Sequence, residues 1–468
     1  MVVGEMPEGL DFLVIGGGPG GYTAALEAAA RGRSVTLVDR AGADGIGGTC
    51  LLEGCIPSKA LIEVADLRHR SLDFAGGALG FDSAVPPDLT RFQEWKNGMV
   101  ARLSSGVRSR LTKAGVTIVA GSFTFTGPQR GVIELDGDAP PQHVEFEGAV
   151  IAVGSTVTQI PPLPFDGETV FDAAGILDVS ELPERLVVVG GGYIGMEIGT
   201  AHRKLGSDVT VVEAAETILP EMPQAAQKHV ARRASKLGIE VLTGHTAQGR
   251  DADGIVIADD SGATRTLPAD AVLVAVGRRP ATRDLGLAAV GITADPAGLI
   301  PVGPDGLAAP GIAAVGDVVA GPALAHKAIA EARVAVDALC GRPAAMVSTA
   351  IPLVVFSDPE VAVVGVTESA AQQEGMSVSV LRMPIGASGR AATMGSTDGV
   401  AEIVVDVDTD AVVGGVLVGP HASELIGELT LAVEMAAAPA DLALTIHPHP
   451  TLSEMLQDTA GLASDPTI

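Results

Sequence analysis

The chain has 468 residues with a formal net charge of −27, 47% hydrophobic residues, 59 glycines and three cysteines. It is too long for one ordinary hydrophobic core, so we expect about three domains in an α/β protein rich in Ala, Val and Gly. Such acidity disfavours nucleic acid and anionic membranes as partners, and so few cysteines argue against a secreted disulfide framework.

The N-terminal segment has no basic stretch before an apolar run, and no run of 18 apolar residues occurs in the chain. A secretion signal requires the first pattern, and a membrane-spanning helix requires the second. We therefore expect a cytoplasmic protein without a membrane span.

A dinucleotide-binding pattern occupies residues 11–39. An apolar strand at 12–15 leads into a glycine-rich turn, an Ala-rich helix follows at 22–31, and a second apolar strand ends on Asp39. In this pattern the glycines let the backbone approach a pyrophosphate at the helix N-terminus, and the acid binds a ribose hydroxyl. The glycines concerned are Gly16, Gly18 and Gly21.

Two of the three cysteines, Cys50 and Cys55, lie close together in a segment that also holds Gly54 and Pro57. Five residues of ideal helix rise about 7.5 Å, which exceeds the Cα separation of a disulfide, so a bond between these cysteines needs a distorted first helical turn. A strained disulfide at a helix start is easily reduced, and the spacing therefore suggests a redox-active pair. Two unrelated buried cysteines are the alternative that spacing alone leaves open.

Two helices are predicted after the cysteines, at 60–72 and at about 89–114, with a turn at 86–87 between them. Short strands then lead to an apolar run that ends at Gly154, as in a crossover that returns the chain to a sheet. The proline-rich segment 161–164 is interpreted as a linker.

Residues 186–213 repeat the dinucleotide-binding pattern, and 23 positions separate the first glycine from the acid in both copies. One such motif is weak evidence, but two copies in complete strand–turn–helix–strand frames indicate two dinucleotide sites. The residues of the second copy are Gly190, Gly192, Gly195 and Glu213.

The two sites are expected to bind different dinucleotides. Glu213 repels a 2′-phosphate and is followed by two alanines, so the second site should prefer NAD to NADP. The first site lies just before the cysteines, so its ligand should exchange electrons with sulfur. A flavin passes electrons between a thiol and a nicotinamide, and we therefore expect FAD there.

A second apolar run, at 271–277, is similar to the strand that ends at Gly154. A further strand at 311–317 ends in Gly-Asp and is followed by a long helix at 323–339. The carboxylate of Asp317 at a strand end is well placed for a ligand hydroxyl, although without further evidence Asp317 is only a turn residue. Cys340, at the end of this helix, is expected to be a buried helical residue.

Residues 346–468 change character. Alternating strands are predicted at 377–381, 402–407 and 412–418, the last two forming a hairpin, and an amphipathic helix follows at 424–437. This pattern predicts a domain with an antiparallel sheet and helices.

The tail carries a second reactive cluster, in which His447 and His449 alternate with prolines. Glu454 lies five residues after His449 and can orient its ring, which is typical of a general base. From this segment alone, a proline-rich turn with surface histidines is the simpler interpretation.

Together, the cysteine segment, the two nucleotide motifs and the tail resemble the pyridine nucleotide-disulfide oxidoreductases over nearly the whole chain. Within this family the chain is most similar to the members that oxidise protein-bound dihydrolipoamide. The matching segments are 47–59, 190–199, 277–280, 316–317, 324–327, 351–352 and 449–454.

The resemblance implies an α/β flavoprotein with two Rossmann-like domains, which bind FAD and NAD, and a C-terminal α+β dimerisation domain. It implies FAD and NAD as cofactors, no metal ion, and oxidation of dihydrolipoamide to lipoamide with reduction of NAD+ to NADH. It also implies a homodimer that serves the lipoylated acyltransferase of 2-oxoacid dehydrogenase complexes.

The resemblance assigns catalytic roles to Cys50, Cys55, His449 and Glu454. His449, supplied by the other subunit and oriented by Glu454, removes a thiol proton, Cys50 is attacked, and Cys55 faces the flavin. Further cofactor-binding positions are Lys59, Gly154, Glu197, Gly277, Asp317 and Ala325, with Lys59 and Glu197 paired near the flavin ring.

We expect residues 1–155 and 277–345 to bind FAD, 156–276 to bind NAD, and 346–468 to form the interface domain. One departure from the family is Leu52-Glu53 between the cysteines, where Glu53 can raise a thiol pKa by its like charge. A reductase of another disulfide or of a quinone, and a non-enzymatic redox sensor that binds FAD and NAD, are the alternatives.

Overall fold

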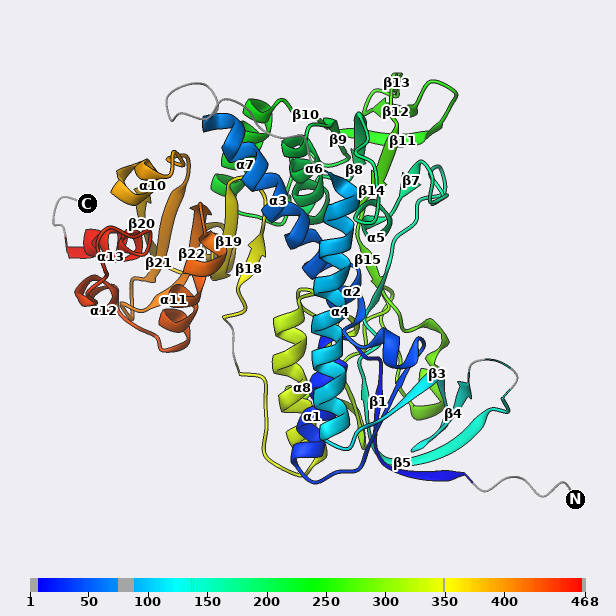
Figure 1. Cartoon of the computed structure of the whole chain (residues 1–468). Helices are drawn as coiled ribbons and strands as arrows, with labels where there is room; N and C mark the ends of the chain where they lie inside the picture. Colours follow the sequence, from blue (N-terminus) through cyan, green and yellow to red (C-terminus); the bar gives the residue numbers. More distant parts are fainter. Residues whose placement is uncertain (1–6, 75–87, 136, 138, 348–349, 465–468) are drawn as a thin grey trace, which may run out of the picture. The chain divides into compact units, whose positions relative to one another are not determined.

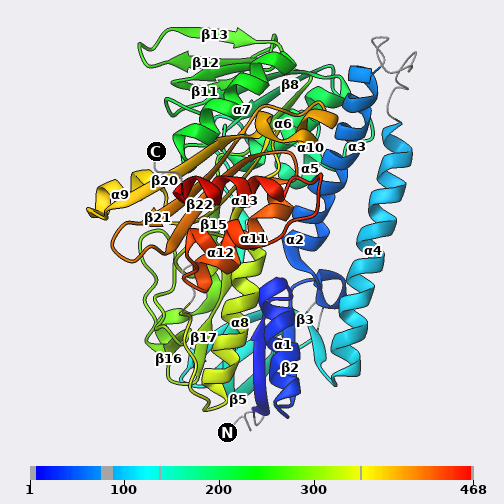
Figure 2. The ribbon, with the colours of Figure 1, turned by 90° about the vertical axis from the view of Figure 1, so that its left-hand side faces the viewer.

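The computed structural model describes residues 7–74, 88–135, 137, 139–347 and 350–464. The chain divides into two compact units built from segments that are distant in sequence (Figures 1 and 2). The first unit consists of Met1–Ala60, Asp88–Thr158 and Gly277–Val347, and the second of Leu61–Pro87, Gln159–Val276 and Ser348–Ile468. The turn expected at 86–87 lies outside the described residues, and the finer division into four segments stays a prediction.

A seven-stranded sheet forms the first unit. Its strands are β1 (Glu8–Ile15), β2 (Val35–Asp39), β3 (Thr117–Gly127), β4 (Arg130–Leu135), β5 (Gln142–Ile151), β16 (Leu307–Ala309) and β17 (Ile312–Ala314). β1 pairs in parallel with β2 and with β5, and β5 pairs in parallel with β17. β3 to β5 form an antiparallel meander. The carboxyl ends of the parallel strands therefore meet at one edge, where a nucleotide binds in such folds.

The two faces of this sheet are covered by separate apolar cores. Phe12 and Val14 of β1 pack into one core, and Leu13 and Ile15 pack into the other, because successive strand side chains alternate between faces. The helices of the unit are α1 (Pro19–Ala30), α2 (Gly48–Leu52), α4 (Leu89–Lys113), α8 (Ala325–Leu339) and the start of α3 (Cys55–Phe74). α1 and α8 lie side by side, with buried alanines at their contact (Figure 1).

Short elements complete the first unit. β6 (Ser155–Val157) and β15 (Arg278–Pro280) form an antiparallel pair. The 3-10 turns are η1 (Gly42–Gly45), η2 (Arg283–Leu285), η3 (Leu287–Val290) and η4 (Gly316–Val318).

The second unit contains a five-stranded parallel sheet. Its strands, in spatial order, are β10 (Glu240–Thr243), β9 (Asp208–Glu213), β8 (Arg185–Val189), β14 (Ala271–Val274) and β7 (Val170–Phe171). The associated helices are α5 (Ala173–Ile176), α6 (Tyr193–Leu205) and α7 (Gln224–Leu237), and a small antiparallel sheet consists of β11 (His245–Arg250), β12 (Ile255–Asp259) and β13 (Thr264–Leu267). The segment interpreted as a linker packs against this region, because Leu163 is buried in its core.

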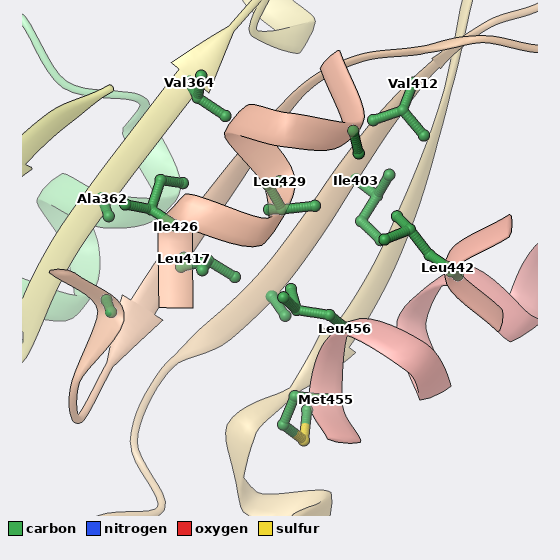
Figure 3. Close-up of a cluster of buried hydrophobic side chains, with 14 of the residues drawn as sticks. Ala362, Val364, Ile403, Val412, Leu417, Ile426, Leu429, Leu442, Met455 and Leu456 are labelled. Atoms are coloured by element: carbon green, nitrogen blue, oxygen red, sulfur yellow. The ribbon is translucent and has the colours of Figure 1, made fainter. Parts of the chain in front are cut away.

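The C-terminal part of the second unit is an antiparallel five-stranded sheet, as predicted. Its strands, in spatial order, are β18 (Leu353–Val355), β19 (Glu360–Gly365), β22 (Val412–Gly419), β21 (Val400–Asp406) and β20 (Val378–Pro384). Leu429 of α11 (Ala422–Glu434) and Leu456 of α13 (Glu454–Gly461) reach the apolar core on this sheet (Figure 3). The other elements are α9 (Glu368–Glu374), α10 (Gly389–Thr393), α12 (Pro439–Leu444), η5 (Ile385–Ala387) and η6 (Leu462–Ser464).

The predicted fold class is confirmed, with two differences in detail. The helix expected at 60–72 begins earlier, at Cys55, and its first turn includes Pro57, where a proline costs no hydrogen bond. Cys340 is the half-buried residue that ends α8 and not a buried residue within it. Among the described residues, no helix is long and apolar enough to cross a membrane.

Candidate redox and nucleotide-binding sites

The first glycine-rich turn joins β1 to α1. Gly16 has a φ of +103°, and a Cβ on it would lie 2.4 Å from the carbonyl oxygen of Ala152. A Cβ on Gly21 would lie 1.8 Å from the carbonyl oxygen of Gly16. Both distances are far below the 3.0 Å that real Cβ contacts keep, so neither position admits a side chain without a backbone shift.

The second turn, between β8 and α6, has the same geometry. Gly190 has a φ of +110°, and a Cβ on it would lie 2.4 Å from the carbonyl oxygen of Ala275. A Cβ on Gly195 would lie 1.9 Å from the carbonyl oxygen of Gly190. The internal repeat seen in the sequence is therefore a repeat of backbone geometry as well.

The acid that ends each motif also shapes its glycine loop. Asp39 accepts hydrogen bonds from the N–H groups of Gly17 at 2.8 Å and Ala41 at 3.0 Å. Glu213 accepts the two equivalent bonds in the second copy, at 2.5 and 2.7 Å. An ionised carboxylate has about four acceptor positions, so each acid still has capacity for a ribose hydroxyl. The sequence predicted only that these acids bind a ribose hydroxyl, and their hydrogen bonds to the backbone of the glycine loop were not predicted.

Both helix N-termini fit the pyrophosphate of a dinucleotide. The N-cap residues of α1 and α6 are Gly18 and Gly192, which offer no capping side chain, and neither helix has an acidic residue in its first turn. A Cβ on Gly192 would meet nothing within 4 Å, so the backbone there is open to a ligand. The first N–H groups of each helix are therefore suited to phosphate oxygens.

The cysteine segment packs directly on the first glycine turn. The N–H of Gly47 donates a hydrogen bond of 2.9 Å to the carbonyl oxygen of Gly17. A Cβ on Gly48 would lie only 2.6 Å from the Cα of Gly18. On α1, burial and then the charge of Cys50 raise the pKa of Tyr22. The cysteine segment and the first glycine turn are therefore in direct contact.

A helix break brings the two cysteines together. α2 ends at Leu52, Glu53 leaves helical geometry with a φ of −131°, and α3 begins at Cys55. This is the distortion that the spacing predicts. Cys50 and Cys55 are both thiols in the structure.

The two thiols interact with each other. The hydrogen bond with Cys55 is the largest cause that raises the pKa of Cys50, burial is the next, and the positive charge of Lys59 opposes them. Glu53, whose like charge was expected to raise a thiol pKa, is not among the main causes of the shift in the Cys50 pKa. The site therefore holds two interacting thiols and a nearby cation.

A polar cluster that the sequence did not reveal surrounds Asp317 in η4. Asp317 accepts a hydrogen bond of 2.5 Å from the Ser155 hydroxyl. Arg278 donates to the same hydroxyl at 2.8 Å and to the Ser155 carbonyl oxygen at 2.7 Å. These bonds fix the Asp317 carboxylate at the carboxyl end of β17.

Two predicted glycines directly precede the paired strands beside this cluster. Gly154 and Gly277 have φ values of +67° and +110°, and each accepts a backbone hydrogen bond next to the β6–β15 pair. Ala325 is the first residue of α8. Lys327 on that helix is buried and pairs with Glu331 at 2.7 Å, and Glu331 accepts the Gly316 N–H at 2.8 Å, which ties α8 to η4.

The tail contains a histidine held by a carboxylate, in the second unit. His449 Nδ1 lies 2.8 Å from Glu454 Oε1, and the other carboxylate oxygen accepts the Thr451 N–H at 2.7 Å. The bond from Thr451 is the largest cause that lowers the pKa of Glu454, followed by the bond with His449. An ionised carboxylate only accepts, so His449 Nδ1 carries the proton and Nε2 is the basic nitrogen. The His449 side chain is 82% exposed.

The two units hold different parts of the predicted machinery. The first unit contains both cysteines, Lys59 and Asp317, and the second contains Glu197, Glu213 and His449. Glu197 is buried on α6, where it accepts the Phe356 N–H at 2.9 Å. The expected pair of Lys59 with Glu197 joins the two units and stays a prediction.

Family comparison agrees with this geometry. The family model of pyridine nucleotide-disulphide oxidoreductases matches residues 10–332, and the dimerisation domain of the same family matches residues 351–460. The chain belongs to this family. Its dihydrolipoyl dehydrogenase members contain FAD and depend on NAD.

Curated relatives match over nearly their full length. A dihydrolipoyl dehydrogenase of Haloferax volcanii is 43% identical, with 98% of this chain and 97% of that protein covered. One of Geobacillus stearothermophilus is 41% identical, with coverage of 99% and 98%.

Two solved structures are similar to the whole chain. LpdA from Mycobacterium tuberculosis is 29% identical with a TM-score of 0.88, and covers 97% of this chain and 100% of its own. The HOCl-induced flavoprotein disulfide reductase RclA from Escherichia coli is 27% identical with a TM-score of 0.84, with coverage of 97% and 99%.

Proposed function

We propose that this chain is a dihydrolipoyl dehydrogenase that contains FAD and uses NAD+. In this reaction the two thiols of dihydrolipoamide lose two electrons and two protons and form the lipoamide disulfide. NAD+ takes up two electrons and one proton as hydride, and the second proton is released.

The observation that carries this proposal is the contact between the cysteine segment and the first glycine turn. A dinucleotide bound at that turn lies next to two sulfurs that already interact. Bound FAD would supply a two-electron carrier between these sulfurs and the nicotinamide of NAD. The full-length similarity to curated dihydrolipoyl dehydrogenases supports the same assignment.

The cysteines carry out thiol–disulfide exchange in this account. A substrate thiolate attacks Cys50 in the Cys50–Cys55 disulfide, the S–S bond breaks, and Cys55 leaves as a thiolate. The second substrate thiol then attacks the substrate sulfur of the mixed disulfide, which closes the lipoamide ring and releases Cys50. Lys59, which opposes the rise in the Cys50 pKa, favours thiolate at this position.

His449 acts as the general base, with Nε2 accepting the substrate thiol proton and Glu454 stabilising the imidazolium that forms. The chain has a dimerisation domain at residues 351–460, which includes His449. We propose that it forms a homodimer in which His449 of one subunit serves the cysteines of its partner. The high exposure of His449 supports a role toward a group outside its own unit.

The physiological substrate in this account is a lipoyl group carried by the acyltransferase of a 2-oxoacid dehydrogenase complex. The scarcity of cysteines favours a cytoplasmic location, where thiols stay reduced. A comparison of kcat/KM for a lipoylated acyltransferase domain and for free dihydrolipoamide tests this partner. Equal kcat/KM values for the two substrates would contradict the proposal that the acyltransferase carries the physiological substrate.

The chain offers its own control for a test of the redox pair. Cys50→Ser should abolish NAD+ reduction by dihydrolipoamide, whereas flavin reduction by NADH should persist, because only the sulfur exchange is removed. Cys340→Ser, at the end of α8, removes the third thiol and should retain wild-type turnover. Retained dihydrolipoamide oxidation in Cys50→Ser would refute the disulfide assignment.

A reductase of another disulfide is the second candidate, favoured by the structural similarity to RclA. A panel of disulfides and quinones with NADH distinguishes the two functions. Lipoamide should be the preferred acceptor by kcat/KM.

A further inference from the structure

His447 differs from His449 in its surroundings, although only one proline separates them. The His447 side chain is 5% exposed, and that of His449 is 82% exposed. The chain itself covers most of the His447 side chain, whereas the His449 side chain is open to an incoming group. The role of His447 must therefore be sought in the contacts that hold it.

Both ring nitrogens of His447 face hydrogen-bond acceptors. Nε2 lies 2.9 Å from Oε1 of Glu428 on α11, and Nδ1 lies 2.9 Å from the carbonyl oxygen of Thr445. The ring is therefore held at both ends, by a side chain of α11 and by the backbone two residues earlier.

The chain between the two histidines is stiff. Pro448 and Pro450 fix their own φ angles, and each proline also restricts the histidine before it to extended conformations. The Thr451 hydroxyl donates a hydrogen bond of 2.7 Å to the Pro448 carbonyl oxygen, which closes the segment on itself. Few backbone rotations are left between the His447 ring and the Cα of His449.

We propose that the His447–Glu428 pair positions His449 by anchoring this stiff segment to α11, a role that rests on the proposed function of His449 as the base. Glu454 orients the His449 ring, and the His447–Glu428 pair fixes the backbone from which that ring projects. His447 is thus a positioning residue that acts through His449 and does not contact substrate.

The electrostatic coupling in the tail is consistent with this arrangement. The pKa of Glu454 is held low first by the Thr451 N–H and then by His449, and the charge of His447 contributes in the same direction. The buried histidine therefore supports the carboxylate that orients the exposed one, in addition to fixing the backbone.

Removal of Glu428 tests the proposal, with one matched control on the same helix. Glu428→Ala deletes the acceptor for His447, Glu428→Gln keeps an oxygen acceptor at the same place, and Glu424→Ala removes an exposed carboxylate one turn earlier on α11. Each purified FAD-containing dimer is mixed anaerobically with dihydrolipoamide or with NADH, and the rate of flavin reduction is followed by stopped flow.

Displacement of His449 should slow only the half-reaction in which dihydrolipoamide reduces the flavin. For Glu428→Ala we expect reduction by dihydrolipoamide to be slower by about tenfold or more, since misplacement of a catalytic group by about 1 Å costs up to about 10²-fold. Reduction by NADH should remain at the wild-type rate. Glu428→Gln should recover most of the lost rate, and Glu424→Ala should behave as wild type.

Two results would overturn the proposal. One is a dihydrolipoamide rate in Glu428→Ala equal to that of Glu424→Ala, and the other is an equal loss in both half-reactions, which marks a general structural defect. If Glu428→Ala does not fold, His447→Gln replaces it under the same criteria. A wild-type protein that is reduced by NADH but not by dihydrolipoamide would instead refute the proposed function.

Discussion

Replacement of Gly195 by alanine should disable the second nucleotide site and leave the first intact. The new Cβ would lie 1.9 Å from the Gly190 carbonyl oxygen and 3.0 Å from Val188 Cγ1, so α6 and the turn must separate by about 1 Å or more. That shift moves the helix N-terminus that receives the pyrophosphate. A displacement of this size costs about 10²-fold in a bound geometry, so the KM for NAD+ should rise by about that factor.

The assay has two readouts and includes the equivalent variant of the first site. The first readout is the NAD+ dependence of dihydrolipoamide oxidation, and the second is the FAD content per chain from the visible spectrum. Gly195→Ala should retain the wild-type FAD content and lose NAD+ affinity. Gly21→Ala, whose Cβ would lie 1.8 Å from the Gly16 carbonyl oxygen, should lose FAD content.

A glycine outside both sites serves as the control. Gly106 lies on the exposed side of α4, and a Cβ on it meets nothing within 4 Å, so Gly106→Ala should change neither readout and should stabilise the helix slightly. The assignment of two separate sites would be refuted if Gly195→Ala bound NAD+ as tightly as this control. It would also be refuted if Gly195→Ala lost FAD as Gly21→Ala does.

Further predictions concern the base and a buried ion pair. His449→Gln should lower dihydrolipoamide turnover by at least about 10²-fold at unchanged FAD content, and turnover equal to that of His143→Gln on β5 would remove His449 from the mechanism. In the second unit, Asp358 pairs with buried Lys204 at 2.8 Å and with Arg233 at 3.0 Å. Lys204 keeps Asp66 as a second partner at 2.5 Å, so Asp358→Asn should lower the free energy of unfolding at pH 7 by about 2 kcal/mol in urea denaturation. Burial raises the pKa of Asp358, but the two cations outweigh it and lower the pKa, so this contribution is present above about pH 4 and is lost as the pH falls further. If the difference in the free energy of unfolding between the wild-type protein and Asp358→Asn grew toward acid pH, the predicted pH dependence would be wrong.

The parts of the site that were predictable are those that impose a local condition on the backbone. Gly16 and Gly190 have positive φ angles, and Gly21 and Gly195 have no room for a Cβ, so only glycine is tolerated and the spacing is visible in the sequence. The cysteine pair also imposes a condition on the local backbone, because two cysteines five residues apart come together only if the helix is broken between them. The helix break could therefore be predicted from the spacing.

The parts that were not predictable are contacts between residues that are distant in sequence. Ser155 and Arg278 meet at Asp317, and Glu428 meets His447, through tertiary packing that leaves no periodic pattern. The sequence presented His447 only as one of two histidines in a proline-rich segment. Its burial became known only from the position of α11.

Anaerobic titration with NADH, followed by the visible spectrum, tests most directly whether the Cys50–Cys55 pair exchanges electrons with bound FAD. After two electrons per FAD, we expect a long-wavelength absorbance band from a thiolate next to oxidised flavin, and we expect Cys55→Ser to lack it. Complete bleaching of the flavin by the first two electrons, with no such band in the wild-type protein, would contradict the proposed relay.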